Sequence, residues 1–283
     1  MVEEIVGTIV GRWYVTAYGV VFVVLALRHL GLKCTVIYTA VAVAAGALAE
    51  NGSVHLGVPF TRYAFNPDLR GHELWVGDVP LMVPLSYTFM AYFAFAAARL
   101  IVAGPYSSRS RQPVLEYVLA VVLATWALWI IDPVSRLGRY FGLGELFRYD
   151  GPGFWFGLPL GSQVGFLFTS GILIGLLTWM TRNEPAVVVP RLRNHPRLPA
   201  LVTYLLQVGF MAGVAFVVAR TSGDAAVAAI ADALAGASLI IGIPTALLTA
   251  VYWRSLRSLE NDRPSPGSNS GGRSGRETSK HRR

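Results

Sequence analysis

The sequence predicts an all-α polytopic membrane protein, a bundle of about seven transmembrane helices. Three observations support this fold class: 54% of the 283 residues are hydrophobic, only 14% are charged, and the mean hydropathy is +0.50. Soluble domains carry roughly 25% charged residues, so a chain of this composition is not expected in water. A cytosolic globular enzyme, a disordered protein and a free nucleic-acid-binding protein are therefore excluded.

Seven apolar stretches are candidates for membrane spans, because a spanning helix needs about 20 mostly apolar residues. They lie at residues 10–27, 34–50, 79–102, 114–131, 156–180, 199–219 and 227–253. The second and the last are rich in alanine rather than leucine. The acidic start, Met1-Val2-Glu3-Glu4, and the lack of a small-residue cleavage pattern argue against a signal peptide.

Basic residues divide unevenly between the loops on the two sides of the predicted bundle. One side holds Arg28, Lys33, Arg99, Arg109, Arg111, Arg182, Arg191, Arg193, Arg197 and the C-terminal segment. The other holds Arg12, Arg62, Arg70, Arg136, Arg139, Arg148 and Arg220. Cytoplasmic loops carry the excess of Arg and Lys, so we expect the N-terminus outside and the C-terminus in the cytoplasm.

This division predicts one transmembrane domain, residues 1–258, with extracytoplasmic loops at 51–78 and 132–155. Residues 259–283 are rich in Ser, Gly and Arg, a composition typical of a disordered basic tail, here on the cytoplasmic side. The single cysteine, Cys34, excludes an internal disulfide and a cysteine-based metal site.

Polar residues at the ends of the spans are informative, because a charge in hydrocarbon is costly. Glu50 ends an apolar run that holds no other charge, and His55 and Tyr63 follow it. At membrane depth, loss of hydration favours the protonated form of the Glu50 carboxyl, which makes it a candidate proton donor. The alternative is a carboxylate at the membrane interface, in contact with water.

Asp132 ends the fourth apolar run and is a second candidate carboxyl. Trp129 lies three residues earlier on the same helical face, and Trp126 lies three residues before that. The alternative is structural, because the residue before a proline disfavours the helical conformation and Asp132-Pro133 would then end the helix. Tryptophans near a span end are also ordinary interfacial anchors.

Two further features fall on the same predicted outer side. Phe154 and Trp155 lead into a glycine-rich fifth span, either as walls of a binding site or as interfacial anchors. Asp232 lies inside the alanine-rich last span. It is either a proton carrier or an ion-pair partner of Arg220 near the membrane surface.

Several chemistries lack their sequence signatures. The last span has no lysine for a retinal Schiff base, and no two histidines stand at the helical spacing of a di-iron desaturase. No pair of aspartates at short helical spacing marks a magnesium-dependent prenyltransferase, and no glycine-rich phosphate loop stands beside a lysine. We therefore expect neither a metal nor a cofactor.

Carboxyls and aromatic residues at one membrane face are what hydration of an alkene requires. If Glu50 and Asp132 meet in one cavity, a protonated carboxyl can protonate an isolated double bond to a tertiary carbocation. Aromatic faces stabilise that cation, and a water positioned by the second carboxyl captures it as a tertiary alcohol. The residues expected to line this cavity are Tyr63, Trp126, Trp129, Phe154 and Trp155, with His55 and Asp232 as further candidates for substrate binding.

Four segments resemble the CruF-type carotenoid biosynthesis family in order and spacing. They are Glu50–Phe65, Val79–Leu85, Trp129–Pro133 and Gly157–Pro159, and the resemblance extends over roughly residues 35–180. The family includes archaeal bisanhydrobacterioruberin hydratases and γ-carotene hydratases of cyanobacteria and other bacteria. The resemblance implies a polytopic membrane hydratase, a hydro-lyase that adds water across the terminal double bond of an acyclic carotenoid end.

The resemblance places Glu50, Pro59, Tyr63, Asp132 and Pro159 at family-like positions. The chain departs from the family pattern after Pro159, where an Asn and a Gly-Trp pair are replaced, and it lacks a glycine after Phe60. The expected partners are a carotenoid or other polyisoprenoid in the bilayer and membrane lipid, with no nucleic acid.

Two other functions remain open from the sequence. In a transporter, Glu50, Asp132 and Asp232 would relay protons or cations, although no inverted repeat supports this. In a non-catalytic carotenoid-binding protein, the same carboxyls would only anchor the chain at the interface.

Overall fold

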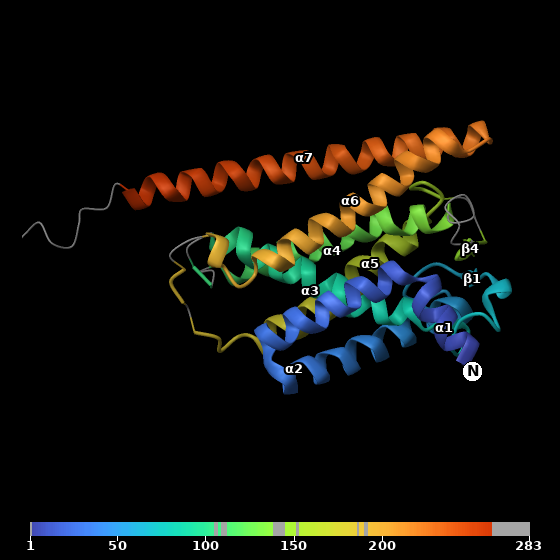
Figure 1. The fold of residues 1–283 in the computed structure, drawn as a ribbon, viewed down its shortest axis with the longest axis horizontal. Helices are drawn as coiled ribbons and strands as arrows, with labels where there is room; N and C mark the ends of the chain where they lie inside the picture. Colours follow the sequence, from blue (N-terminus) through green and yellow to red (C-terminus); the bar gives the residue numbers. More distant parts are fainter. Residues whose placement is uncertain are drawn as a thin grey trace, which may run out of the picture.

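The computed structural model describes residues 2–104, 107–108, 112–137, 145–150, 153–185, 187–189 and 192–261. The helices are α1 (Val2–Gly11), α2 (Trp13–Leu56), α3 (Met82–Ala103), α4 (Pro113–Arg136), α5 (Leu160–Met180), α6 (Leu198–Thr221) and α7 (Ala225–Asn261). The short strands and 3-10 turns are β1 (Tyr63–Phe65), η1 (Pro67–Leu69), β2 (Trp75–Val76), β3 (Val79–Pro80), β4 (Phe147–Tyr149) and η3 (Leu192–Asn194). The predicted all-α bundle is confirmed (Figure 1).

Five of the described helices, α2 to α6, are long and apolar enough to cross a membrane. This is the architecture of an integral membrane protein. The seventh predicted span, residues 227–253, lies within α7, whose apolar stretch in the described part of the chain is the shorter Ala225–Leu239.

Helix α2 contains the first two predicted spans, joined at Gly31. Gly31 has φ 75° and ψ 167°, a backbone conformation that is essentially restricted to glycine. The rings of Phe22 and Tyr38, on either side of it, lie 6.1 Å apart between centroids. Sixteen residues of straight helix would separate them by about 24 Å. The α2 chain therefore folds back on itself at Gly31, as Figure 1 shows, and supplies two antiparallel spans.

Helix α1 was not predicted, since the first apolar stretch was expected to begin at residue 10. It packs on the loop between α2 and α3. The Thr8 hydroxyl accepts a hydrogen bond from the backbone N–H of Leu74 at 2.7 Å. A Cβ on Gly7 would lie 1.9 Å from the carbonyl oxygen of His72, so only glycine allows this contact.

Two helices run beyond their predicted ends and shorten both predicted outer loops. Helix α2 continues to Leu56, where Gly57 caps it with φ 73°. Helix α4 continues through Asp132 and Pro133 to Arg136, so the interpretation of Asp132-Pro133 as a helix stop is wrong. Pro133 has no N–H to bond the Trp129 carbonyl, and the indole Nε1 of Trp155 donates to that oxygen instead, at 2.9 Å.

The predicted basic tail begins inside a helix, because residues 259–261 belong to α7. Residues 262–283 lie outside the described residues, as do residues 138–144 and 151–152 of the second predicted loop. The same holds for four of the basic residues used to predict orientation, namely Arg109, Arg111, Arg139 and Arg191.

Helix α3 forms the centre of the bundle. Every residue from Tyr87 to Leu100 is buried, so this helix is covered on all sides. The loops gather at two ends (Figure 1). The end that holds α1, β1 and β4 is called the strand end, and the end that holds the connector between α5 and α6 is called the opposite end.

Candidate functional site

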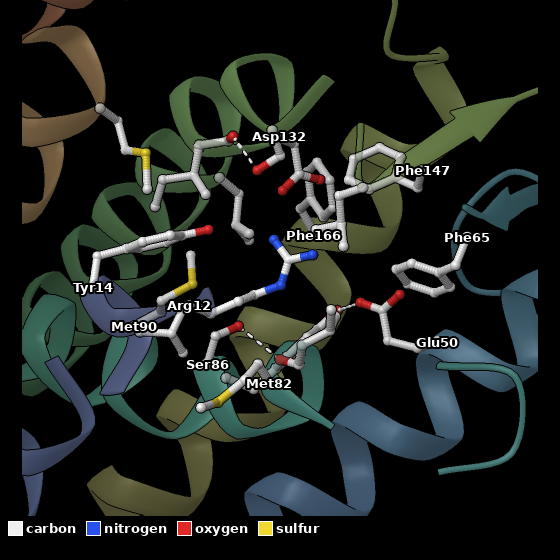
Figure 2. A pocket seen from close by; sticks show the side chains of 18 of the residues that line it. Arg12, Tyr14, Glu50, Phe65, Met82, Ser86, Met90, Asp132, Phe147 and Phe166 are labelled. Carbon is white, nitrogen blue, oxygen red and sulfur yellow. Dashed lines mark hydrogen bonds between the residues drawn. The ribbon is translucent and has the colours of Figure 1, made fainter. Parts of the chain in front are cut away.

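A cavity of about 90 Å³ lies at the strand end, among helices α2 to α6 and the two strands β1 and β4 (Figure 2). Both predicted carboxyls line it, Glu50 from α2 and Asp132 from α4. Ten further lining residues are aromatic: Tyr14, Tyr18, Phe60, Tyr63, Phe65, Tyr87, Phe89, Phe147, Tyr149 and Phe166. The cavity therefore combines two acids with an aromatic lining.

The pairing of β1 with β4 builds one wall of the cavity. The strands are antiparallel, with Tyr63 opposite Tyr149 and Phe65 opposite Phe147. Alternate residues of a strand point to the same face, so these four rings share one side, whereas Ala64 of β1 is exposed. The rings of Tyr63 and Tyr149 lie 5.2 Å apart between centroids. Burial and then the charge of Asp132 raise the pKa of Tyr149, which stays a neutral phenol.

Phe60 is held in the wall by the turn that follows α2. Its backbone N–H donates to the Ser53 hydroxyl at 3.0 Å, and that hydroxyl donates to the Ala49 carbonyl at 2.8 Å. On α5, a Cβ at Gly165 would lie 2.5 Å from the Phe60 ring. A glycine is needed here for α5 to approach the turn.

Two tyrosine hydroxyls hold the carboxylate of Glu50, which is only 6% exposed. Tyr87 donates to Oε1 at 2.5 Å, and Tyr63 donates to Oε2. Gly46, one helical turn before Glu50, makes the first contact possible, because a Cβ there would meet the Tyr87 ring at 3.1 Å. Burial away from water favours the protonated form of a carboxyl, and the two phenolic donors counter this by stabilising the charged form.

Asp132 has a different environment on the opposite wall. Within the described part of the chain, no side chain donates a hydrogen bond to its carboxylate or forms an ion pair with it. It is close enough to Glu50 for the two groups to interact electrostatically. Among the described residues, one carboxyl of the cavity thus has two donors, and the other faces the open space without one.

Arg12 and Gln207 add buried polar atoms to the same cavity. The Arg12 guanidinium extends into it (Figure 2), and its Nε donates to Glu73 Oε2 at 3.0 Å. Burial lowers the pKa of Arg12, but Tyr14 and Glu73 raise it above its ordinary value, so the group stays charged. Arg12 Nη2 and Gln207 Oε1 are buried and have no partner among the described residues. A buried donor and a buried acceptor around one cavity are what a bound water needs.

Of the predicted site residues, the structure brings Glu50, Asp132 and Tyr63 together. Trp129 and Trp155 do not line the cavity; their ring centroids lie 5.7 Å apart with the ring planes tilted by 44°. Trp126 is half-buried against the core, and Phe154 is 72% exposed. None of Trp126, Trp129, Phe154 and Trp155 therefore belongs to the aromatic wall of the cavity.

His55 and Asp232 also lie outside the cavity, on the surface. His55 Nε2 lies 3.0 Å from Asp78 Oδ2, and both side chains are about half exposed. Asp232 Oδ1 lies 3.3 Å from Arg220 Nη2, in an exposed pair. The ion-pair alternative for Asp232 therefore matches the observed geometry.

Sequence reasoning missed Tyr87, Phe147, Tyr149, Arg12 and Gln207. The strand residues carried a signal, since aromatic residues alternate with others in both strands, the period-two pattern of a half-buried strand. Arg12 and Gln207 also carried a signal, because each is a polar residue within a predicted span. Among the described residues, no three His, Cys, Asp or Glu side chains are grouped as ligands for a metal ion.

The sequence model of a protein family matches residues 10–235, a range that contains every residue lining the cavity. The family is described as carotenoid biosynthesis protein. No curated protein matches the chain, and no solved structure matches it.

Proposed function

Because the chain belongs to the carotenoid biosynthesis protein family, we propose that it is a membrane hydratase that adds water across the terminal double bond of an acyclic carotenoid end. The observation that carries the proposal is the meeting of Glu50 and Asp132 in one aromatic cavity. Hydration of an isolated alkene needs a proton donor, a water and surroundings that tolerate a carbocation. The cavity contains groups suited to each of these tasks.

Asp132 is assigned as the acid. Its carboxyl faces the cavity without a hydrogen-bond donor among the described residues, and loss of hydration without a compensating donor favours the protonated form. The O–H proton passes to the less substituted carbon of the terminal double bond. The π electron pair forms the new C–H bond, and the tertiary carbon becomes a cation.

Glu50 is assigned as the base. Tyr63 and Tyr87 stabilise its carboxylate, which accepts a proton from a water as the water oxygen bonds to the tertiary cation. The product is a tertiary alcohol, and the alkene has gained one water. Proton transfer from Glu50 to Asp132 through water in the cavity restores the starting state.

The remaining groups suit the intermediates of this reaction. Rings such as those of Phe166 and Phe147 present faces that stabilise a cation. The positive charge of Arg12 is neutralised by Glu73, so it does not oppose the cation. Arg12 Nη2 and Gln207 Oε1 are the buried donor and acceptor that hold the attacking water.

The test is co-expression with a pathway that makes an acyclic-ended carotenoid, followed by mass analysis of the extracted pigments. The wild type is expected to yield a pigment heavier by one water. Asp132→Asn and Glu50→Gln are expected to yield none. Asp78→Asn, which changes an exposed carboxylate at the same end of the bundle, is the matched control and is expected to behave as the wild type. Unchanged pigment from the wild type, with the protein present in the membrane, would contradict the proposal.

We also propose that the strand end faces the extracytoplasmic side, with the N-terminus outside and the C-terminus in the cytoplasm. Basic residues of the connectors at the opposite end, such as Arg182, Arg193 and Arg197, support this orientation. In a Cys34→Ala background, His72→Cys would place an exposed thiol at the strand end. A membrane-impermeant maleimide is expected to label this thiol in intact cells. Labelling only after lysis would show that the strand end faces the cytoplasm.

A further inference from the structure

A second, narrower cavity of about 20 Å³ lies next to the first, between α3, α4 and α5. Tyr87, Met90 and Leu128 line both cavities. The two spaces therefore share part of their walls, and one of the shared residues is the flexible Met90.

The second cavity lies deeper in the bundle than the first. On α3 it reaches Ala91, one turn beyond Tyr87, and on α4 it reaches Ala124, one turn before Leu128. On α5 it is lined by Ser170, one turn beyond the Phe166 that lines the first cavity. All three shifts point from the strand end towards the middle of the membrane, by about 5.4 Å per turn. The two cavities follow one another along the bundle axis.

The wall of the second cavity is mostly apolar, and three of its side chains are small. Ala91, Ala124 and Ser170 are 4%, 2% and 5% exposed, so helices rather than lipid surround the space. Thr169, also in the wall, donates its hydroxyl to the Gly165 carbonyl of its own helix at 2.9 Å. The wall offers a ligand few free hydrogen-bonding groups, which suits a hydrocarbon.

We propose that the hydrocarbon chain next to the reacting end passes through the second cavity as a channel, so that the substrate lies lengthwise between α3, α4 and α5. At about 20 Å³ the space holds roughly one water-sized group, so the chain enters it when the flexible side chain of Met90 moves aside. This inference rests on the proposed function, since it takes the terminal double bond to lie beside Glu50 and Asp132. The first cavity, at about 90 Å³, accommodates the branched end of an isoprenoid but not a forty-carbon chain. The chain must leave it, and the wall shared with the second cavity gives it an apolar path into the membrane interior.

The channel predicts a chain-length effect that a defect in the reaction itself would not produce. Ala124→Val and Ser170→Val narrow the second cavity without touching the first. With a forty-carbon acyclic carotenoid, the rate of hydration by purified protein is expected to fall about tenfold, because the added methyl groups occupy the space that the chain needs. With a ten-carbon acyclic hydrocarbon carrying the same terminal group, the rate is expected to stay within about twofold of the wild type.

Ala120→Val is the matched control. Ala120 lies one turn before Ala124 on α4, is fully buried and lines neither cavity. It is expected to affect both substrates equally. The channel is refuted if Ala124→Val and Ser170→Val slow both substrates alike, or if they slow neither.

A second measurement separates this inference from the proposed function. If the wild type hydrates neither substrate, the proposed function fails and the channel is tested by carotenoid retention alone. The visible absorption of carotenoid that co-purifies with the protein is then compared between the wild type, Ala124→Val and Ala120→Val. A reduced occupancy confined to Ala124→Val supports the channel, and equal occupancy in all three overturns it.

Discussion

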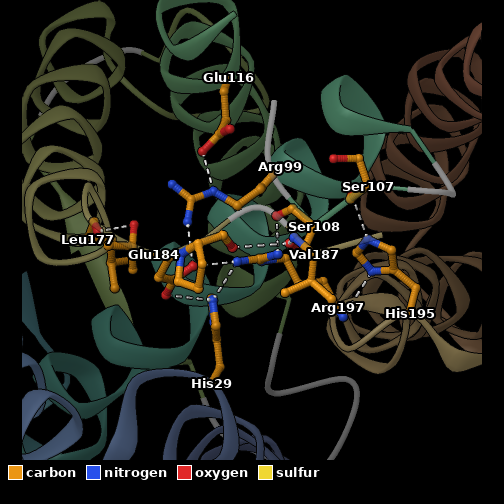
Figure 3. A network of polar contacts seen from close by, with 12 residues as sticks. His29, Arg99, Ser107, Ser108, Glu116, Leu177, Glu184, Val187, His195 and Arg197 are labelled. Atoms are coloured by element: carbon orange, nitrogen blue, oxygen red, sulfur yellow. Dashed lines mark hydrogen bonds and ion pairs between the residues drawn. The ribbon is translucent and has the colours of Figure 1, made fainter. Parts of the chain in front are cut away.

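The two ends of the bundle differ in the groups that bind their carboxylates. At the opposite end, Glu116 and Glu184 meet Arg99, which bonds Glu116 Oε1 through Nε and Glu184 Oε2 through Nη1 at 3.2 Å (Figure 3). Arg197 Nη2 donates to Glu184 Oε2 at 2.7 Å. At the strand end, Glu50 receives only tyrosine hydroxyls, and Asp132 receives no donor among the described residues.

The network at the opposite end joins segments that are distant in the sequence. Arg197 Nη1 donates to the Ser108 carbonyl at 2.5 Å, and Arg197 Nη2 lies 2.9 Å from His29 Nε2 on α2. His195 Nε2 donates to the Ser107 carbonyl at 3.1 Å, while its Nδ1 accepts the backbone N–H of Arg197. This network of ion pairs and hydrogen bonds thereby links α2, α3 and α4 to the segment that leads into α6.

The comparison teaches how to separate structural from functional carboxyls in this membrane protein. A buried charge that is paired with arginine has its cost offset, and its removal disrupts the fold. A buried carboxyl without a cation is costly to keep in the charged form, and proteins place such groups where their proton is used. The four carboxyls therefore divide into Glu116 and Glu184, which stabilise, and Glu50 and Asp132, which we propose react.

The largest expected effect on stability is at Arg99. Arg99→Met leaves Glu116 buried without a cation, and breaking a buried pair costs about 3–5 kcal/mol. We expect a clearly lower melting temperature in detergent, with hydration per folded molecule unchanged. Adding Glu116→Gln to Arg99→Met should restore part of the loss. A melting temperature equal to that of the wild type would remove the structural half of the comparison.

A smaller effect, on activity rather than stability, is expected at Tyr87. Tyr87→Phe removes one donor from Glu50 and leaves the ring in place. A hydrogen bond to a charged group contributes about 1.5–3 kcal/mol, so the rate of hydration should fall about tenfold to a hundredfold. Tyr92→Phe on the same helix, which loses only a 3.4 Å contact with His29, is the control. Equal rates for Tyr87→Phe and Tyr92→Phe would show that Tyr87 does not position Glu50.

The smallest expected effect is a loss of stability in acid that depends on Glu184. Burial raises the pKa of Glu184, but the hydrogen bond from His29 and the charges of Arg197 and Arg99 lower it, and the pKa ends below its ordinary value. A carboxyl with a lowered pKa stabilises the fold above its unfolded-state pKa, and this contribution is lost as the pH falls through the folded-state value. Melting temperatures measured from neutral to acidic pH should therefore fall less steeply in Glu184→Gln than in the wild type. Parallel curves would contradict this.

Much of the fold could be predicted from the sequence, because each membrane span is a continuous apolar stretch. Both halves of α2 and the spans of α3 to α6 lie close to the expected residues. The meeting of Glu50 and Asp132 was predictable as well, since both end spans on the same side of the bundle. Two separate spans were predicted on either side of Gly31, and the structure has both. The sharp reversal at Gly31 itself was not predicted.

The remaining features depend on contacts between distant residues. Helix α4 continues through Pro133, and Trp155 donates a hydrogen bond to the carbonyl that the proline leaves free. The residues next to Pro133 in the sequence do not predict this contact. The tyrosine that reaches Glu50 from α3 depends on how closely Gly46 lets the two helices approach. The aromatic wall depends on the pairing of β1 with β4, two short segments far apart in the chain. Helix ends and cavity walls were therefore the least predictable parts.

The most direct test of the central claim is to measure hydration and melting temperature on the same purified preparation of Asp132→Asn. Asp132 has no partner to lose among the described residues, so the amide should leave the melting temperature equal to or above that of the wild type. Removal of a general acid costs about 10²–10⁴-fold in rate, so hydration should fall below detection. Retained hydration would contradict the assignment of Asp132 as the proton donor. Lost hydration with a clearly lowered melting temperature would show that Asp132, like Glu116, is there to stabilise the fold.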